Sequence, residues 1–244
     1  MVVILTSLVE VRQTYLSSSV CSALIKRMIY MKIWDGFVRV YHWAQVVLIA
    51  ALWWTAEEGE MVWHQWLAMT LLAFWLTRLG WGLFGSETAR FSSFVKPPYK
   101  AIQYGRALLQ GKASHGIGHD PLGAWMIVAL LLILGVQMTS GLFATDEIFV
   151  EGPLAQYVSA DVATFITQIH HMNFNVLLGL AAIHIAAVLI MQWRGMNLIS
   201  PMIEGRDYVR SVTQAGPEFK PVWKAWVLFA VFWIGLYIWF RTVL

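Results

Sequence analysis

The chain has 244 residues, of which 59% are hydrophobic and 13% are charged, and its formal net charge is +3. A soluble domain carries about a quarter charged residues, so this composition indicates a protein that is surrounded largely by lipid. The single cysteine, Cys21, excludes an intrachain disulfide, a cysteine-ligated iron–sulfur cluster and a haem attached through a C-x-x-C-H motif.

The first 30 residues do not read as a signal peptide. Glu10 and Arg12 interrupt the apolar run, and basic residues follow this run instead of preceding it. We expect residues 1–30 to be an N-terminal extension, either disordered or the result of a start assigned too far upstream. The patterned part of the chain then opens at Met31.

Five apolar segments are long enough to span a membrane as α-helices, which takes about 20 residues each. They are Phe37–Thr55, Met61–Phe84, Pro121–Phe143, Phe165–Trp193 and Val222–Arg241. The predicted fold class is therefore all-α, a membrane-spanning helix bundle. We expect residues 31–205 to form a four-helix domain and residues 206–244 to form a linker and a fifth transmembrane helix. Between the second and third spans, Tyr99–Lys112 has the pattern of a short amphipathic surface helix.

Basic and acidic residues segregate to opposite sides of the predicted spans. The N-terminal side of span 1, the loop between spans 2 and 3 and the segment after span 4 are rich in lysine and arginine. The other two loops contain no lysine or arginine, and their charged residues are Glu57, Glu58, Glu60, Asp146, Glu147, Glu151 and Asp161. By the positive-inside rule, we expect a multi-pass protein of the bacterial inner membrane with a cytoplasmic N-terminus and a periplasmic C-terminus.

Five histidines lie inside predicted spans, where an ionisable side chain is costly and usually faces the bundle interior. They are His42, His64, His170, His171 and His184. A single histidine of this kind more often forms an interhelical hydrogen bond or lies at the interface. However, His170 and His184 lie within about 40° of one helix face and about 21 Å apart along the helix axis. Since His171 lies about 140° around the helix from His184, His170 is the better candidate ligand.

The alternating directions of the spans place these histidines at two depths. Span 1 runs outward and span 4 runs inward, so His42 and His184 both lie toward the cytoplasmic side. Spans 2 and 4 both begin outside, so His64 and His170 lie toward the outer side. We therefore predict two stacked sites, formed by the pairs His42/His184 and His64/His170.

Two histidines at each site favour haem iron over zinc or copper. Imidazole suits all three metals, but no nearby cysteine or carboxylate completes a tetrahedral zinc shell. The apolar spans can enclose a macrocycle between facing helices. Two axial histidines leave no open iron position, which favours electron transfer. We expect two non-covalent haem b groups, with Arg39 and Arg78 as candidates to contact propionates of the cytoplasmic-side haem. The alternative is that both arginines are ordinary basic flanks of their spans.

Seven short motifs between about Trp34 and Glu204 carry a family resemblance. They are WDGFVRVYHW at 34–43, HQWLA at 64–68, RLGWG at 78–82, GHDPLG at 118–123, TSGL at 139–142, EGPL at 151–154 and HHMNFN at 170–175. Each motif alone is weak, but together they resemble the bacterial cytochrome b561 family, which is related to the b-type cytochrome subunits of nickel–iron hydrogenases.

The resemblance implies axial ligands at His42, His64, His170 and His184 in a membrane electron carrier. Such a carrier works between a quinone pool, ubiquinone or menaquinone, and a redox partner such as a c-type cytochrome or another redox subunit. Many relatives stop after four spans, so we expect the fifth helix to serve a partner. Apart from these partners we expect membrane lipid and no nucleic acid.

Two other functions stay open, and with them the question whether the protein is an enzyme in its own right. Some relatives act as superoxide:quinone oxidoreductases, but the acidic outer loops would not steer an anion inward. A non-redox membrane anchor or transporter would use the histidines as proton relays, and their paired depths speak against this. His119, in the cytoplasmic loop, is expected to cap that loop, and the alternative is that it assists a proton or a haem propionate.

Overall fold

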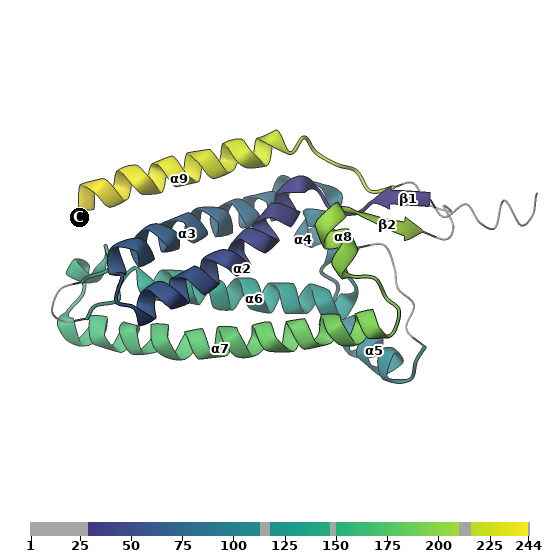
Figure 1. The fold of residues 1–244 in the computed structure, drawn as a ribbon, viewed down its shortest axis with the longest axis horizontal. Coiled ribbons are helices and arrows are strands. Elements are labelled where there is room, and N and C mark those ends of the chain that lie inside the picture. The colour runs from purple at the N-terminus through teal and green to yellow at the C-terminus, as the bar shows by residue number, and fades with distance from the viewer. Residues whose placement is uncertain (1–28, 113–117, 147–149, 210–215, 244) are drawn as a thin grey trace, which may run out of the picture.

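The structure of the protein is a computed structural model that describes residues 29–112, 118–146, 150–209 and 216–243. Residues 1–28 of the predicted N-terminal extension therefore lie outside the described residues. Within the described part, five long helices are apolar enough to cross a membrane (Figure 1). They are α2 (Gly36–Glu57), α3 (Met61–Phe84), α6 (Pro121–Gly141), α7 (Ala160–Trp193) and α9 (Trp223–Val243). The prediction of an all-α bundle with five membrane spans is confirmed.

The longest helix, α7, begins at Ala160, earlier than the predicted start at Phe165. Its 34 residues extend over about 51 Å at the rise of an α-helix. The hydrocarbon core of a bilayer is about 30 Å thick, so α7 continues beyond it.

Short elements connect the long helices, mostly at one end of the bundle. They are β1 (Ile29–Lys32), η1 (Glu87–Ala89), α4 (Phe91–Phe94), α5 (Pro98–Leu109), η2 (Ala155–Tyr157), α8 (Ile199–Glu204) and β2 (Arg206–Val209). Helix α5 confirms the predicted surface helix. The strands β1 and β2 pair antiparallel with Lys32 opposite Arg206, and they were not predicted from the sequence.

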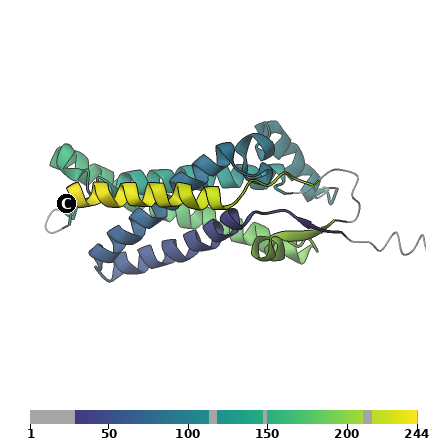
Figure 2. The same ribbon diagram turned by 90° about the horizontal axis from the view of Figure 1, so that it is seen from above.

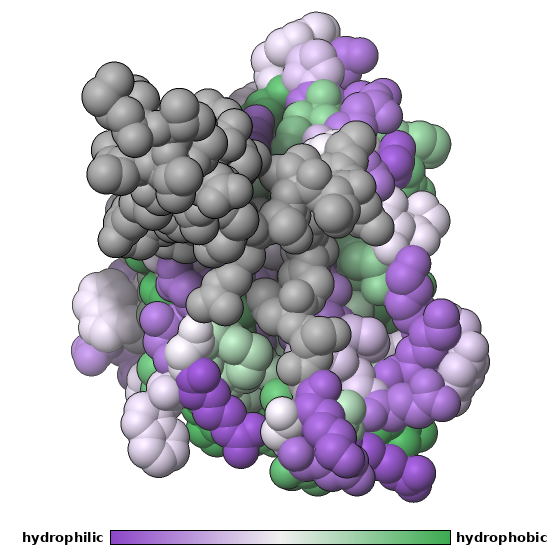
Figure 3. Space-filling model, turned by 90° about the vertical axis from the view of Figure 1, so that its right-hand side faces the viewer, coloured by the Kyte–Doolittle hydropathy of each residue, from purple (hydrophilic) through white to green (hydrophobic). Residues whose placement is uncertain are grey.

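The bundle has a basic end and an acidic end. The basic end is where α2, α6 and α9 begin, and the charged residues around it include Lys96, Lys100, Arg106, Lys112 and Arg194. Figure 3 looks onto this end, where hydrophilic side chains gather around the rim of the described surface. The acidic end carries Glu57, Glu58, Glu60, Asp146, Glu151 and Asp161.

Helices α2, α3, α6 and α7 lie side by side, and α9 runs along the outside of α3 (Figures 1 and 2). Extensive backbone contacts join α6 to α7, α2 to α3 and α3 to α9. Between α7 and α2, backbone contacts of this kind are sparse within the described residues.

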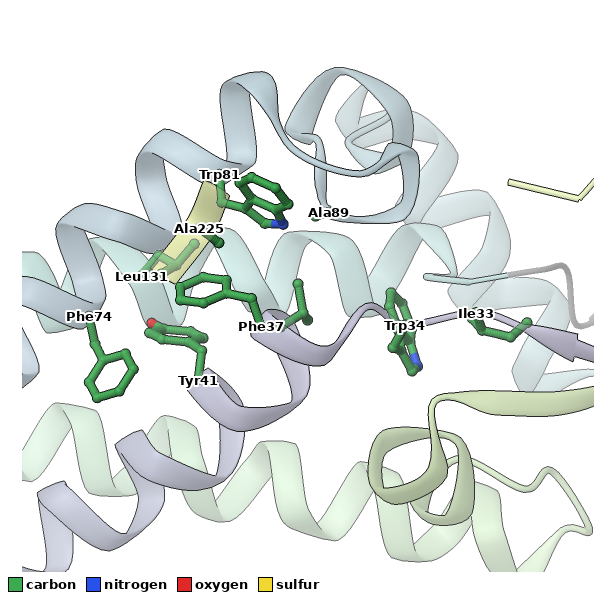
Figure 4. Close-up of a cluster of buried hydrophobic side chains, with 10 residues drawn as sticks. Ile33, Trp34, Phe37, Tyr41, Phe74, Trp81, Ala89, Leu131 and Ala225 are labelled. Atoms are coloured by element: carbon green, nitrogen blue, oxygen red, sulfur yellow. The ribbon is translucent and has the colours of Figure 1, made fainter. Parts of the chain in front are cut away.

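Aromatic side chains form a buried cluster toward the basic end, where α2, α3 and α9 meet (Figure 4). Phe37 is fully buried and its ring packs edge-on against Trp81, with ring centroids 6.2 Å apart. Tyr41, one turn further along α2, packs against Phe74 of α3 at 6.4 Å. This cluster fixes the first turns of α2, which also carry His42, against α3.

A buried carboxylate joins the start of α2 to α3. Asp35 caps α2 by accepting the N–H of Val38 at 2.9 Å through Oδ1, while Oδ2 accepts the indole N–H of Trp81 at 2.8 Å. A buried charge is costly unless it is hydrogen-bonded, and here two donors satisfy it. The cap therefore sets the start of α2 and its position relative to α3.

Candidate functional site

The four candidate ligands come from three helices and meet in pairs at two depths. The rings of His42 on α2 and His184 on α7 are neighbours, with their centroids 6.5 Å apart and their planes at 60°. An imidazole nitrogen lies about 2.0 Å from a bound metal, so two rings on opposite sides of one ion have centroids about 6 Å apart. The separation of this pair therefore fits a single metal ion held between two axial rings. The other pair, His64 on α3 and His170 on α7, lines one cavity toward the acidic end.

The ring of His42 has a nitrogen without a partner. Its Nδ1 atom is buried and makes no hydrogen bond with the described residues. A buried polar atom in this state costs about 1–3 kcal/mol. Imidazole nitrogens are common metal ligands, so a ring nitrogen left without a partner is available to a bound metal ion at His42.

The ring of His64 is oriented by the backbone of α2. Its Nδ1 lies 3.0 Å from the carbonyl oxygen of Leu52 and 3.3 Å from the hydroxyl of Thr55. A carbonyl oxygen only accepts, so Nδ1–H donates and the lone pair is placed on Nε2. This is the arrangement by which metal-bound histidines are commonly held.

The ring of His170 lies against the backbone of α6. Its Nδ1 is 3.1 Å from the carbonyl oxygen of Gln137 and 3.1 Å from the hydroxyl of Ser140. A Cβ atom at Gly141 would lie only 2.9 Å from Cε1 of the ring. The glycine therefore makes room for the ring. The carbonyl again favours Nδ1–H with the lone pair on Nε2, and the side-chain amide of Gln137 lies 3.2 Å from that nitrogen.

A cavity of about 440 Å³ opens beside His64 and His170. Its walls are mainly apolar and come from α2, α3, α6, α7 and α9, and they include Leu52, Leu71, Leu134, Met138, Leu177, Leu236, Trp239 and Phe240. Pockets of about 300–1,000 Å³ hold drug-sized ligands and cofactors. The donor set and the apolar walls thus suit a macrocycle with an iron at its centre.

Adjacent histidines on α7 have different surroundings. His170 is half-buried and hydrogen-bonded to α6, whereas His171 is exposed at the rim of the same cavity. Their ring centroids are 6.2 Å apart. The structure therefore sets His170, and not His171, against the backbone that orients it.

The two candidate arginines lie toward the basic end but in different surroundings. A guanidinium N–H of Arg39 donates to the carbonyl oxygen of Ile203 in α8. Arg78 is only 3% exposed, donates to the carbonyl oxygen of Ala89 at 3.2 Å and lies over the ring of Phe91. Neither arginine forms an ion pair with a carboxylate of the described chain.

His119 packs between two aromatic rings. Its ring centroid is 4.4 Å from that of Trp34 and 4.7 Å from that of Phe94. Burial, assisted by the positive charge of Arg78 and by His184, lowers the pKa of His119 to about 3. His119 is therefore neutral at pH 7 and lies close enough to both groups to interact with them electrostatically.

Three polar residues of the site were not predicted. Gln137 and Ser140 of α6 and Asn173 of α7 are buried beside His170. The signal available in the sequence was that polar side chains interrupt otherwise apolar spans, which is rare without a function. Among the described residues, no three His, Cys, Asp or Glu side chains converge as a metal-ion site, so the paired histidines stand apart from zinc-type clusters.

Comparison with known proteins gives one match. The family described as prokaryotic cytochrome b561 matches residues 33–205, which is more than half of the chain and includes all four candidate ligands. No curated protein and no solved structure matches significantly.

Proposed function

The chain belongs to the prokaryotic cytochrome b561 family, and we propose that it is a dihaem electron carrier of the bacterial inner membrane. Family membership means that the protein binds haem b and transfers electrons, and the five apolar helices make it a multi-pass membrane protein. Beyond this, we propose the number of haems, the residues that bind them, and the donor and acceptor of electrons.

The observation that carries the proposal is the pairing of histidines along α7. One helix presents His170 and His184 inward at two depths, and each lies near a histidine from a different helix. His42 and His184 would hold the inner haem, and His64 and His170 would hold the outer haem. The Leu52 carbonyl at His64 and the Gln137 carbonyl at His170 support binding of iron at Nε2.

When bound, haem supplies one-electron redox chemistry, and two axial imidazoles leave no iron position for oxygen or substrate. The chain itself contributes the apolar walls, which exclude water and tune the potentials. It also fixes the distance between the two sites, because both depend on α7.

We propose Arg78 as the partner of a propionate of the inner haem. Its buried guanidinium forms no ion pair with a carboxylate of the described residues, although Asp35 lies near enough to act on it electrostatically, and a buried charge without a direct partner is strongly unfavourable. The hydroxyl of Tyr41, which lies near Arg78, is also buried and has no hydrogen-bond partner in the described part of the chain. Arg39 is the second candidate, because its Nε is buried without a partner among the same residues.

The distribution of charge supports a direction of insertion and a kind of partner. The basic end would face the cytoplasm, and the acidic end would face the periplasm. Electrons would pass between the quinone pool, ubiquinone or menaquinone, and a partner such as a basic c-type cytochrome that is attracted to the acidic end. The same acidity disfavours superoxide as a substrate, because it would repel the anion.

Substitution of His170 tests the ligand assignment. Purified wild-type protein should contain two haems per chain with a split reduced-minus-oxidised spectrum. His170→Ala should lose the outer haem and keep the inner one, because only the outer pair loses a ligand. The measurement is the haem-to-protein ratio together with the low-temperature spectrum.

His171→Ala is the matched control, because it removes the neighbouring imidazole and should leave both haems bound. Wild-type protein with a single haem, or His170→Ala with an undiminished haem content, would contradict the proposal.

A further inference from the structure

A chain of buried amides connects α6 with α7 beside His170. Gln137 and Asn173 are 6% and 7% exposed and lie within two predicted membrane spans. Polar groups at such positions are unfavourable unless their hydrogen bonds are made. Their hydrogen bonds join Asn173 to Gln137, and Gln137 to the ring of His170.

The backbone of α6 fixes the orientation of both amides. Asn173 Nδ2 donates to the carbonyl oxygen of Ile133 at 3.0 Å and to Oε1 of Gln137 at 2.8 Å. Because a backbone carbonyl can only accept, the NH₂ group of Asn173 must point toward α6. The oxygen of Gln137 is then committed to Asn173, and its own NH₂ group must face the other way, toward His170.

The NH₂ group of Gln137 lies beside the ring of His170 without displacing its main partner. Nε2 of Gln137 is 3.3 Å from Nδ1 and 3.2 Å from Nε2 of the ring, so it lies at nearly equal distances from both nitrogens. The Nδ1 atom keeps the backbone carbonyl of Gln137 at 3.1 Å. A substitution of the Gln137 side chain would therefore remove the amide and leave the carbonyl in place.

The carbonyl and the amide act on the ring in opposite directions. The carbonyl accepts the Nδ1 proton and makes the imidazole a stronger ligand. With Nδ1 protonated, the amide N–H can donate only to the lone pair of Nε2, which bound iron would take. The amide would then keep only the positive end of its dipole near the ring, in a low-dielectric interior where such a dipole has a large effect. Ferric haem carries one more positive charge than ferrous haem, so a nearby positive dipole end favours the ferrous form.

We propose that Gln137, held in place by Asn173, is a positioning residue that raises the reduction potential of the haem bound at His170. The inference rests on the proposed function, because it requires His170 to be an axial ligand. The two buried amides would then help to set the reduction potential of the outer haem relative to that of the inner haem.

Redox titration of matched variants tests this inference. Gln137→Met keeps the length of the side chain and removes the amide, so the midpoint potential of the outer haem should fall while that of the inner haem stays unchanged. Asn173→Leu removes the group that orients Gln137, so it should shift the same midpoint in the same direction by a smaller amount. The outer haem is identified as the one that His170→Ala loses.

Asn175→Leu is the control on the same helix. Asn175 is exposed and its Nδ2 donates to the carbonyl oxygen of His171 at 3.3 Å, so its replacement should leave both midpoints unchanged. Outer-haem midpoints in Gln137→Met and Asn173→Leu equal to that of Asn175→Leu would overturn the inference. Loss of the outer haem from both variants would also overturn it, because the amides would then serve only to hold the site together. Retention of both haems in His170→Ala would instead overturn the proposed function itself.

Discussion

Gly141 is the residue at which α6 comes closest to a candidate ligand. The helix needs no side chain there, and any added carbon would meet the edge of the His170 ring. Protein interiors are close-packed, so the ring could not give way without losing its hydrogen bonds to Gln137 and Ser140. The space at this glycine is therefore part of the site.

Gly141→Val should expel the outer haem. Its Cβ would lie 2.9 Å from Cε1 of His170, and the two methyl groups of valine would press further against the ring. We expect half of the bound haem to be lost, with the inner haem retained, as measured by the haem-to-protein ratio. Gly179→Val is the control, because a Cβ there would meet nothing within 4 Å. Equal haem contents in the two variants would show that the ring tolerates the added bulk.

At the residue scale, the sequence could indicate candidate ligands but not the groups that orient their rings. The spacing of His170 and His184 follows from helix periodicity alone, so it is visible in the sequence. The bond from His64 to the carbonyl of Leu52 depends on how α3 docks against α2, and every residue offers the same backbone carbonyl. No sequence pattern could therefore have singled out Leu52.

At the scale of elements, α9 is attached to α3 by a seam of aromatic contacts. Trp66 of α3 packs against Tyr237 and Phe240 at centroid distances of 5.7 and 5.6 Å. The indole N–H of Trp233 donates to the hydroxyl of Thr70 at 3.3 Å. The last turns of α9 also line the cavity beside His64 and His170. The fifth helix was expected to serve a partner, and its position adds a contact with the outer site that the sequence did not reveal.

Removing the cavity-facing aromatics of α9 should weaken retention of the outer haem. The double variant Trp239→Ala/Phe240→Ala opens the cavity wall, so transfer of the outer haem to an excess of a soluble haem acceptor should be several-fold faster than in the wild type. Ile238→Ala is the control, because Ile238 is 56% exposed on the face turned away from the bundle. An unchanged transfer rate in the double variant would mean that α9 does not help to close the site.

The elements that the sequence missed are those whose pairing is long-range. The five long helices follow from local apolar patterns, and so they were predicted within a few residues of their ends. Strands β1 and β2 have four residues each and pair across more than 170 residues of chain. Strands this short carry little local signal, so their pairing could be seen only in the folded molecule.

For the whole molecule, the separation of charge between the two ends predicts how a soluble partner approaches. The acidic end would attract a basic c-type cytochrome, and salt would screen this attraction, since the Debye length falls from about 30 Å at 0.01 M to about 3 Å at 1 M. We therefore expect electron transfer from the reduced protein to a basic cytochrome to slow as salt is raised, as followed by stopped-flow absorbance.

The triple variant Glu57→Gln/Glu58→Gln/Glu60→Gln should flatten this salt dependence, because it removes three of the acidic charges at that end. Its matched control is Glu87→Gln/Glu218→Gln, since these acids lie at the basic end. A rate that does not respond to salt, or a response equal in both variants, would argue for a partner that docks elsewhere.

Both proposed haem sites take a ligand from the same helix, α7, and this limits how the spacing between the two sites can change. Inserting one residue between His170 and His184 would swing one ring about 100° away from its partner. The gap between the sites can therefore be lengthened or shortened only in steps close to a complete turn, about 5.4 Å. A change in the length of a loop elsewhere in the chain would leave this spacing along α7 unchanged.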